Sequence, residues 1–146
     1  MEVLQRKGKS MNNKTFWIGF VVVFVVMQAY GYVVHGVMLS DTYQSLASIF
    51  RPEAEMMDMM WIMTVGSALV MLLFCYIFTQ GYQGKGVAEG VRYGALMGLF
   101  ISIPVVDQYV VYPLPGDLAV NWFLTGVIGF IISGAIFAAI YKPSTT

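Results

Sequence analysis

Long runs of apolar residues dominate the chain and predict its secondary structure. Four runs, 16–39, 57–80, 87–106 and 118–141, contain few charged side chains. Each has about the 20 residues that an α-helix needs to cross the hydrocarbon core of a bilayer. A helix that is apolar on every side has no polar face to present to water. We therefore predict an all-α integral membrane protein with four antiparallel transmembrane helices, joined as two hairpins.

The segments between these runs are short and carry the polar residues. Residues 1–14 form a basic tail that we expect to be disordered, 15–142 form the transmembrane domain, and 143–146 form a C-terminal tail. Pro52 suits the start of the second helix, because a first-turn proline loses no helical hydrogen bond. Pro104 is expected to kink or end the third helix. Its lack of an N–H removes a hydrogen bond from the helix interior.

Composition supports lipid as the surroundings of the chain. Hydrophobic residues make up 58% of the sequence and charged residues 11%, whereas a soluble domain has about 25% charged residues. The formal net charge is zero, which argues against nucleic acid as a partner. Cys75 is the single cysteine, so a disulfide within one chain is impossible.

Basic residues are distributed unevenly along the predicted topology. Positive residues are retained on the cytoplasmic side of membrane proteins, so we expect both termini and the second loop to be cytoplasmic. Loops one and three then lie on the outer face, where Arg51 is the only basic residue. The short loops are typical of a bacterial inner membrane protein. The basic residues on the expected cytoplasmic side are Arg6, Lys7, Lys9, Lys14, Lys85, Arg92 and Lys142.

A row of glycines at a spacing of four residues, Gly86, Gly90, Gly94 and Gly98, follows the third helix. Residues at this spacing lie on one side of an α-helix. Small residues let two helix backbones approach closely in lipid. We interpret the row as a packing seam, a glycine zipper, that faces the fourth helix or a second copy of the chain. A glycine-lined path for a substrate is the alternative.

Polar side chains inside the apolar runs form a second pattern. Gln28, near the middle of the first run, is followed by Tyr32 and His35 on the same helix face. Such groups are costly in a membrane and usually face the interior of the bundle. We expect them to meet polar residues of the other spans in a pocket open to the outer side. The residues predicted for this pocket are Gln28, Tyr32, His35, Thr64, Ser102, Asp107, Asn121 and Thr125.

His35 is the only histidine of the chain and has two main interpretations. As a structural residue, it donates a hydrogen bond that fixes the first helix. As a functional residue, it pairs with Asp107 in a proton-sensitive or solute-binding element, because a neighbouring carboxylate moves the titration of a histidine across physiological pH. Ligation of haem by two histidines of one copy is excluded.

Methionines gather near the start of the second helix, where Met56, Met59, Met60 and Met63 share one face. Thioethers are soft ligands that suit Cu(I), so these four residues are a weak candidate metal site. Methionine is also a flexible filler of apolar packing. We therefore favour packing, or a surface for a partner, over a metal site.

Little in the sequence indicates catalysis. A nucleophile needs a base within reach, and the predicted topology separates Cys75 from His35. Glu89 and Arg92 are three residues apart, so we expect them to form an ion pair along the third helix. We predict no enzymatic activity and no cofactor.

The sequence favours a non-enzymatic structural or accessory subunit of a homo-oligomer or larger membrane complex. Its predicted partners are the lipid bilayer and other membrane subunits. A small transporter or channel that uses Gln28, His35 and Asp107 is the first alternative. A redox subunit associated with a metal, haem or quinone at the outer face is the second.

Overall fold

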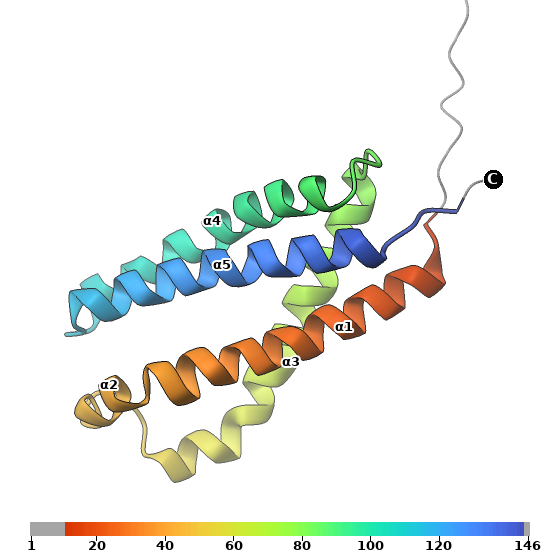
Figure 1. Ribbon diagram of the computed structural model, residues 1–146. Coiled ribbons are helices and arrows are strands. Elements are labelled where there is room, and N and C mark those ends of the chain that lie inside the picture. The colour runs from red at the N-terminus through yellow and green to blue at the C-terminus, as the bar shows by residue number, and fades with distance from the viewer. Residues whose placement is uncertain (1–10, 145–146) are drawn as a thin grey trace, which may run out of the picture.

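The computed structural model describes residues 11–144 as a set of long helices joined by short loops (Figure 1). Four of these helices are long and apolar enough to cross a membrane. The predictions of an all-α chain and of four such helices are therefore confirmed. In chain order the elements are α1 (Asn13–Gly31), a π-helical segment (Tyr32–Met38), α2 (Ser40–Ser45), α3 (Glu53–Gly81), α4 (Val87–Val111) and α5 (Gly116–Ile140).

Several helix boundaries differ from those expected, and α3, for example, begins at Glu53 and not at residue 57. Helix α1 begins at Asn13, because the side chain of Asn12 caps it by accepting the N–H of Thr15 at 3.3 Å. Residues 13 and 14 thus belong to the helix, while 1–10 of the predicted tail and 145–146 lie outside the described residues. Helix α4 continues through Pro104 to Val111, so Pro104 does not end it. Pro52 directly precedes α3, as its sequence position indicated.

The long helices run back and forth, and the two ends of the described chain meet at one end of the molecule (Figure 1). There the hydroxyl of Thr15 donates to the carbonyl of Lys142 at 3.0 Å. We call this the terminal end. The opposite end, which holds α2 and the connection between α4 and α5, is called the α2 end.

Helix α5 lies between α1 and α4 and packs most extensively on α4. The hydroxyl of Tyr30 donates to the carbonyl of Thr125 at 2.8 Å and joins α1 to α5. The hydroxyl of Tyr93 donates to the carbonyl of Phe74 at 2.6 Å and joins α4 to α3. Each bond gives a tyrosine hydroxyl an acceptor inside an apolar bundle, where an unpaired polar group is costly.

Buried side chains form two clusters, one toward each end. The smaller cluster, at the α2 end, contains Val34, Leu39, Leu114 and Leu118. The larger one is rich in aromatic rings that meet edge to face, as Phe78 and Phe137 do at 5.6 Å. It consists of Phe16, Val23, Met71, Phe74, Cys75, Phe78, Phe130, Phe137, Ala138 and Tyr141.

Helix α3 differs between its two halves. Its second half supplies Met71, Phe74, Cys75 and Phe78 to the aromatic cluster. Its first half, 53–70, contains no buried residue. The helix is thus held to the bundle near the terminal end, and its first half presents most of its side chains to the surroundings.

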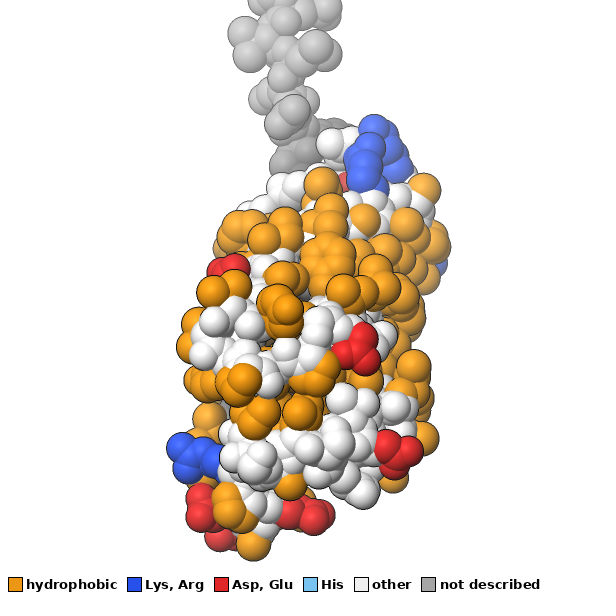
Figure 2. Space-filling model, turned by 90° about the vertical axis from the view of Figure 1, so that its left-hand side faces the viewer, with side chains coloured by type: hydrophobic (Ala, Val, Ile, Leu, Met, Phe, Trp, Pro, Cys, Tyr) orange, Lys and Arg blue, Asp and Glu red, His pale blue; other side chains and the backbone are white. Residues whose placement is uncertain are grey.

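The surface at the α2 end is largely apolar (Figure 2). Acidic side chains are scattered over it, and basic side chains appear beside acidic ones at the lower edge and again at the top of the view. The exposed apolar side chains include Val110 and Val111 of α4. These exposed apolar side chains of α4 suit contact with lipid better than contact with water.

Candidate functional site

Three glycines of the predicted row form the contact between α4 and α5. Gly90, Gly94 and Gly98 are buried. A Cβ added to Gly94 would lie 2.8 Å from the Cα of Ile131, and one added to Gly98 would lie 3.0 Å from the Cα of Val127. The two backbones therefore approach so closely that a methyl group does not fit between them.

Gly86 does not belong to this contact, contrary to the interpretation of the row. It precedes α4 with a φ of +65°, and a Cβ added to it would meet nothing within 4 Å. Glycine is favoured there by its backbone conformation, which other residues rarely adopt. The remaining glycines, Gly90, Gly94 and Gly98, face α5 of the same chain. A second copy therefore has no access to them.

Within residues 11–144, no hydrogen bond joins the side chains of any two of the eight polar residues predicted to share a pocket. Gln28 meets Ser67 of α3, whose hydroxyl is 3.1 Å from the side-chain oxygen of Gln28. Ser102 is buried between α4 and α5, where its hydroxyl oxygen would contact a Cβ on Gly126. Asp107 is exposed near the end of α4.

The other predicted members of the pocket bond to backbone or are exposed. Thr64 and Thr125 donate their hydroxyls to carbonyls one turn earlier in their own helices. Asn121 is exposed, and Tyr32 is 71% exposed. Two cavities, one at each end of the molecule, are lined by other residues and by none of these eight.

His35 is paired with Tyr43 of α2 and not with Asp107. The distance between His35 Nδ1 and Tyr43 Oη is 2.6 Å. Among residues 11–144, the one ion pair is that of Arg51 with Glu55. The alternative of a His35–Asp107 pair is not found, because the chain folds back at α2 and brings the Tyr43 hydroxyl to the imidazole, in line with the structural interpretation of His35.

A π-helical segment, Tyr32–Met38, directly precedes the place where the chain folds back at α2. The N–H of Leu39 donates to the carbonyl of Val34, five residues earlier, at 3.0 Å. Leu39 and Val34 are both buried in the small cluster at the α2 end. Short π-helical turns in α-helices are frequently found at functional sites. His35 lies within this segment.

Three side chains from different elements form a hydrogen-bonded chain at the α2 end. The indole N–H of Trp122 in α5 donates to Tyr43 Oη at 2.8 Å, and the same hydroxyl is hydrogen-bonded to His35 Nδ1. Burial raises the pKa of Tyr43, although the bond from Trp122 opposes this shift. The hydroxyl therefore keeps its proton at neutral pH. We call this arrangement the Trp122–Tyr43–His35 chain.

Replacing Tyr43 with phenylalanine tests this chain. We expect Tyr43→Phe to destabilise the protein by about 1–3 kcal/mol, because Trp122 and His35 both lose their partner. Thermal unfolding in detergent, followed by circular dichroism, measures the change. Tyr32→Phe is the matched control, since the Tyr32 hydroxyl makes no hydrogen bond within residues 11–144. Equal melting temperatures for the two variants would contradict a structural role of the Trp122–Tyr43–His35 chain.

A cavity of about 300 Å³ lies beside Trp122 at the α2 end. It is formed by the connection from α2 to α3, the last turn of α4, the following loop and α5. We call it the α2-end cavity. Its lining residues are Ile49, Phe50, Arg51, Gln108, Tyr112, Leu114 and Trp122.

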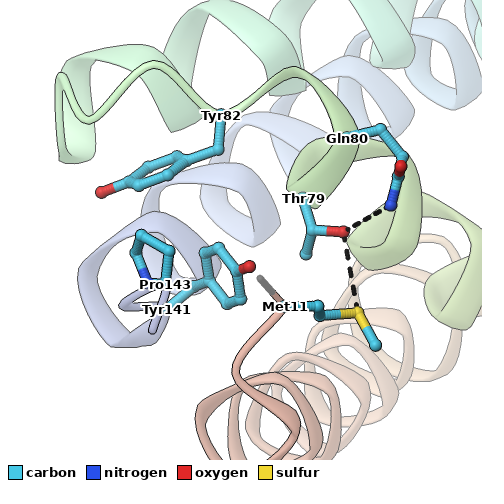
Figure 3. Close-up of a pocket in the computed structure, with 6 residues that line it drawn as sticks. All are labelled: Met11, Thr79, Gln80, Tyr82, Tyr141 and Pro143. Carbon is cyan, nitrogen blue, oxygen red and sulfur yellow. Dashed lines mark hydrogen bonds between the residues drawn. The ribbon is translucent and has the colours of Figure 1, made fainter. Parts of the chain in front are cut away.

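A second cavity of similar size opens at the terminal end (Figure 3). The Gln80 amide donates to the Thr79 hydroxyl at 3.2 Å, and this hydroxyl lies 3.9 Å from the sulfur of Met11. Tyr82, Tyr141 and Pro143 complete the lining. Met11 is the first described residue, so this cavity borders the limit of the described chain.

The methionines at the start of α3 lie on its exposed half. Met56, Met60 and Met63 are exposed and Met59 is partly buried. Within the described part of the chain, no three His, Cys, Asp or Glu side chains are placed to hold a metal ion. Cys75 is fully buried in the aromatic cluster.

Glu89 has a role that the sequence interpretation missed. Its two carboxylate oxygens accept the backbone N–H groups of Gln83 and Lys85 at 2.6 and 2.9 Å. Glu89 is 7% exposed, and Arg92 is exposed and forms no ion pair with it. The signal was present, because a carboxylate in the first turn of a helix is placed to accept backbone N–H groups.

No family model, curated protein or solved structure matches this chain. A functional proposal therefore depends on the geometry of the chain's own residues.

Proposed function

We propose that the protein is a non-enzymatic multi-pass membrane subunit that assembles laterally with further copies of itself. In this proposal the terminal end faces the cytoplasm, because Lys14, Lys85, Arg92 and Lys142 lie there and Arg51 lies at the α2 end. One observation carries the proposal, and it concerns the side chain of Gln28.

Gln28 is a polar side chain near the middle of an apolar span, and it is exposed. An amide side chain has two donor hydrogens and an acceptor oxygen. Within residues 11–144, Gln28 makes one side-chain hydrogen bond, to Ser67. At mid-bilayer depth, each remaining group without a partner costs several kcal/mol. This cost favours an arrangement in which another polar group covers Gln28.

The surface around Gln28 suits a second copy of the chain. Val25 and Tyr32, one turn away on either side, are exposed. Ala29 is small and exposed, and it allows close approach of a second helix. Two amides related by a two-fold axis can each donate to the other. A symmetric pair therefore satisfies both copies with the same side chain.

A transport role receives weaker support. None of the residues predicted for a transport pocket lines either of the two cavities at the ends of the molecule, and His35 bonds to Tyr43 and not to Asp107. The exposed apolar half of α3 adds further surface for neighbouring subunits.

Replacing Gln28 with leucine tests the proposal. Tagged and untagged copies of the unchanged protein are produced together. We expect the untagged copy to be purified with the tagged copy in mild detergent. We expect Gln28→Leu to weaken this association on the order of tenfold, because a polar contact between membrane helices contributes about 1–2 kcal/mol. Native mass spectrometry measures the ratio of dimer to monomer.

The control is Gln44→Leu, which removes an exposed amide of α2. This variant should assemble like the unchanged protein. A monomeric unchanged protein in both detergent and lipid nanodiscs would contradict the proposed function. So would a Gln28→Leu variant that assembles normally.

A further inference from the structure

The α2-end cavity combines an apolar lining with polar side chains at its edge. Ile49, Phe50 and Leu114 supply apolar surface, and Leu114 is buried. Trp122 also lines it, with its N–H already bonded to Tyr43. Pockets for small molecules typically have this composition, with mostly apolar walls and a few convergent polar groups.

Three donor side chains line the cavity without strong partners. Within the described residues, the Gln108 amide and the Tyr112 hydroxyl make no side-chain hydrogen bond. Arg51 has Glu55 at 3.7 Å, which is longer than a hydrogen bond. A guanidinium, an amide and a hydroxyl together match the oxygens of a phosphate group, which a guanidinium binds through two parallel bonds.

The position of the cavity points to lipid as the source of this phosphate. Gln108 lies in the last turn of α4 and Trp122 in the second turn of α5. Helices that cross a bilayer place these turns at the level of the lipid head groups, where tryptophan and tyrosine are enriched. A lipid reaches such a cavity by lateral diffusion within its leaflet.

We propose that the α2-end cavity binds the head group of a phospholipid that carries both a phosphate and an ammonium group. The phosphate lies against Arg51, Gln108 and Tyr112. A cavity of about 300 Å³ holds a head group and not a whole phospholipid. The acyl chains therefore follow the exposed surface of α4 at Val110 and Val111.

Charge at the α2 end selects a zwitterionic head over an anionic one. Glu55 is beside Arg51, so groups of opposite charge adjoin the same cavity. Asp107 and Asp117 add further negative charge at this end. Acidic neighbours repel a lipid with net negative charge and attract an ammonium group. This inference is independent of the proposed assembly, because each single chain contains the complete cavity.

Native mass spectrometry of the full chain in detergent, titrated with dioleoylphosphatidylcholine, tests the proposal. We expect one lipid to be retained per chain. We expect Arg51→Gln to weaken retention on the order of tenfold, the effect of losing a charged hydrogen bond. The matched control is Arg92→Gln, which removes an exposed arginine at the terminal end and should retain the lipid fully. Gln108→Leu should weaken retention less than Arg51→Gln.

Three results would overturn the proposal. The first is equal retention by Arg51→Gln and the unchanged protein, with the fold of both verified by circular dichroism. The second is tighter retention of dioleoylphosphatidylglycerol than of dioleoylphosphatidylcholine, since the charge argument requires the reverse. The third is displacement of the lipid by millimolar inorganic phosphate, which would identify a site for the free anion.

Discussion

A Gly94→Ala substitution is expected to destabilise the protein by about 3 kcal/mol, at the upper end of the usual cost of overpacking. The added methyl would meet the carbonyl oxygen of Phe130 and would lie 2.8 Å from the Cα of Ile131. Both contacts are with backbone, which cannot rotate out of the way as a side chain can. The methyl group therefore forces α4 and α5 apart along their closest contact.

A glycine-to-alanine substitution at Gly66 should raise the stability of the protein, whereas Gly94→Ala should lower it. Gly66 lies inside α3, and a Cβ added to it would meet nothing within 4 Å. Gly66→Ala should stabilise the helix by up to about 1 kcal/mol, because alanine loses less backbone entropy than glycine. Unfolding of both variants in the same detergent measures the difference. Equal stability of Gly94→Ala and Gly66→Ala would show that the α4–α5 contact is looser than the structure indicates.

The glycines also show what can be predicted from spacing alone. A period of four residues identifies one side of a helix, so Gly90, Gly94 and Gly98 could be assigned to a common face. Spacing does not identify the neighbour that this face meets. Nor does it distinguish Gly86, whose position depends on the backbone conformation of the preceding loop.

The four long helices were predictable because hydrophobic runs of this length have few other stable structures. The pairing of polar side chains was not predictable in the same way. His35 meets Tyr43 because a π-helical turn and the six-residue helix α2 return the chain toward α5. A one-residue shift in that turn moves the imidazole to another side of the helix. The sequence pattern does not determine this shift.

The α2-end cavity was missed for a related reason. Its residues come from four separate segments, and each segment alone resembles an ordinary loop or helix end. Arg51 stood out in the sequence as the only basic residue at this end. Its closeness to Gln108 and Tyr112 depends on how the two hairpins pack together, which periodicity does not describe.

The loop between α3 and α4 should depend strongly on Glu89. We expect Glu89→Ala to destabilise the protein by about 3 kcal/mol, because each hydrogen bond to a charged acceptor contributes about 1.5–3 kcal/mol. The stability of Glu89→Gln should lie between that of Glu89→Ala and that of the unchanged protein. The glutamine amide has one acceptor oxygen, so it can replace only one of the two carboxylate oxygens. Denaturant unfolding in detergent gives this order.

Amide hydrogen exchange at Gln83 and Lys85 distinguishes this role from a general loss of packing. Glu89→Ala should lose protection at these two amides before the rest of α4, because their acceptor is gone. Glu55→Gln is the control, as Glu55 is exposed and its pairing with Arg51 contributes little. Unchanged protection in Glu89→Ala would contradict the role.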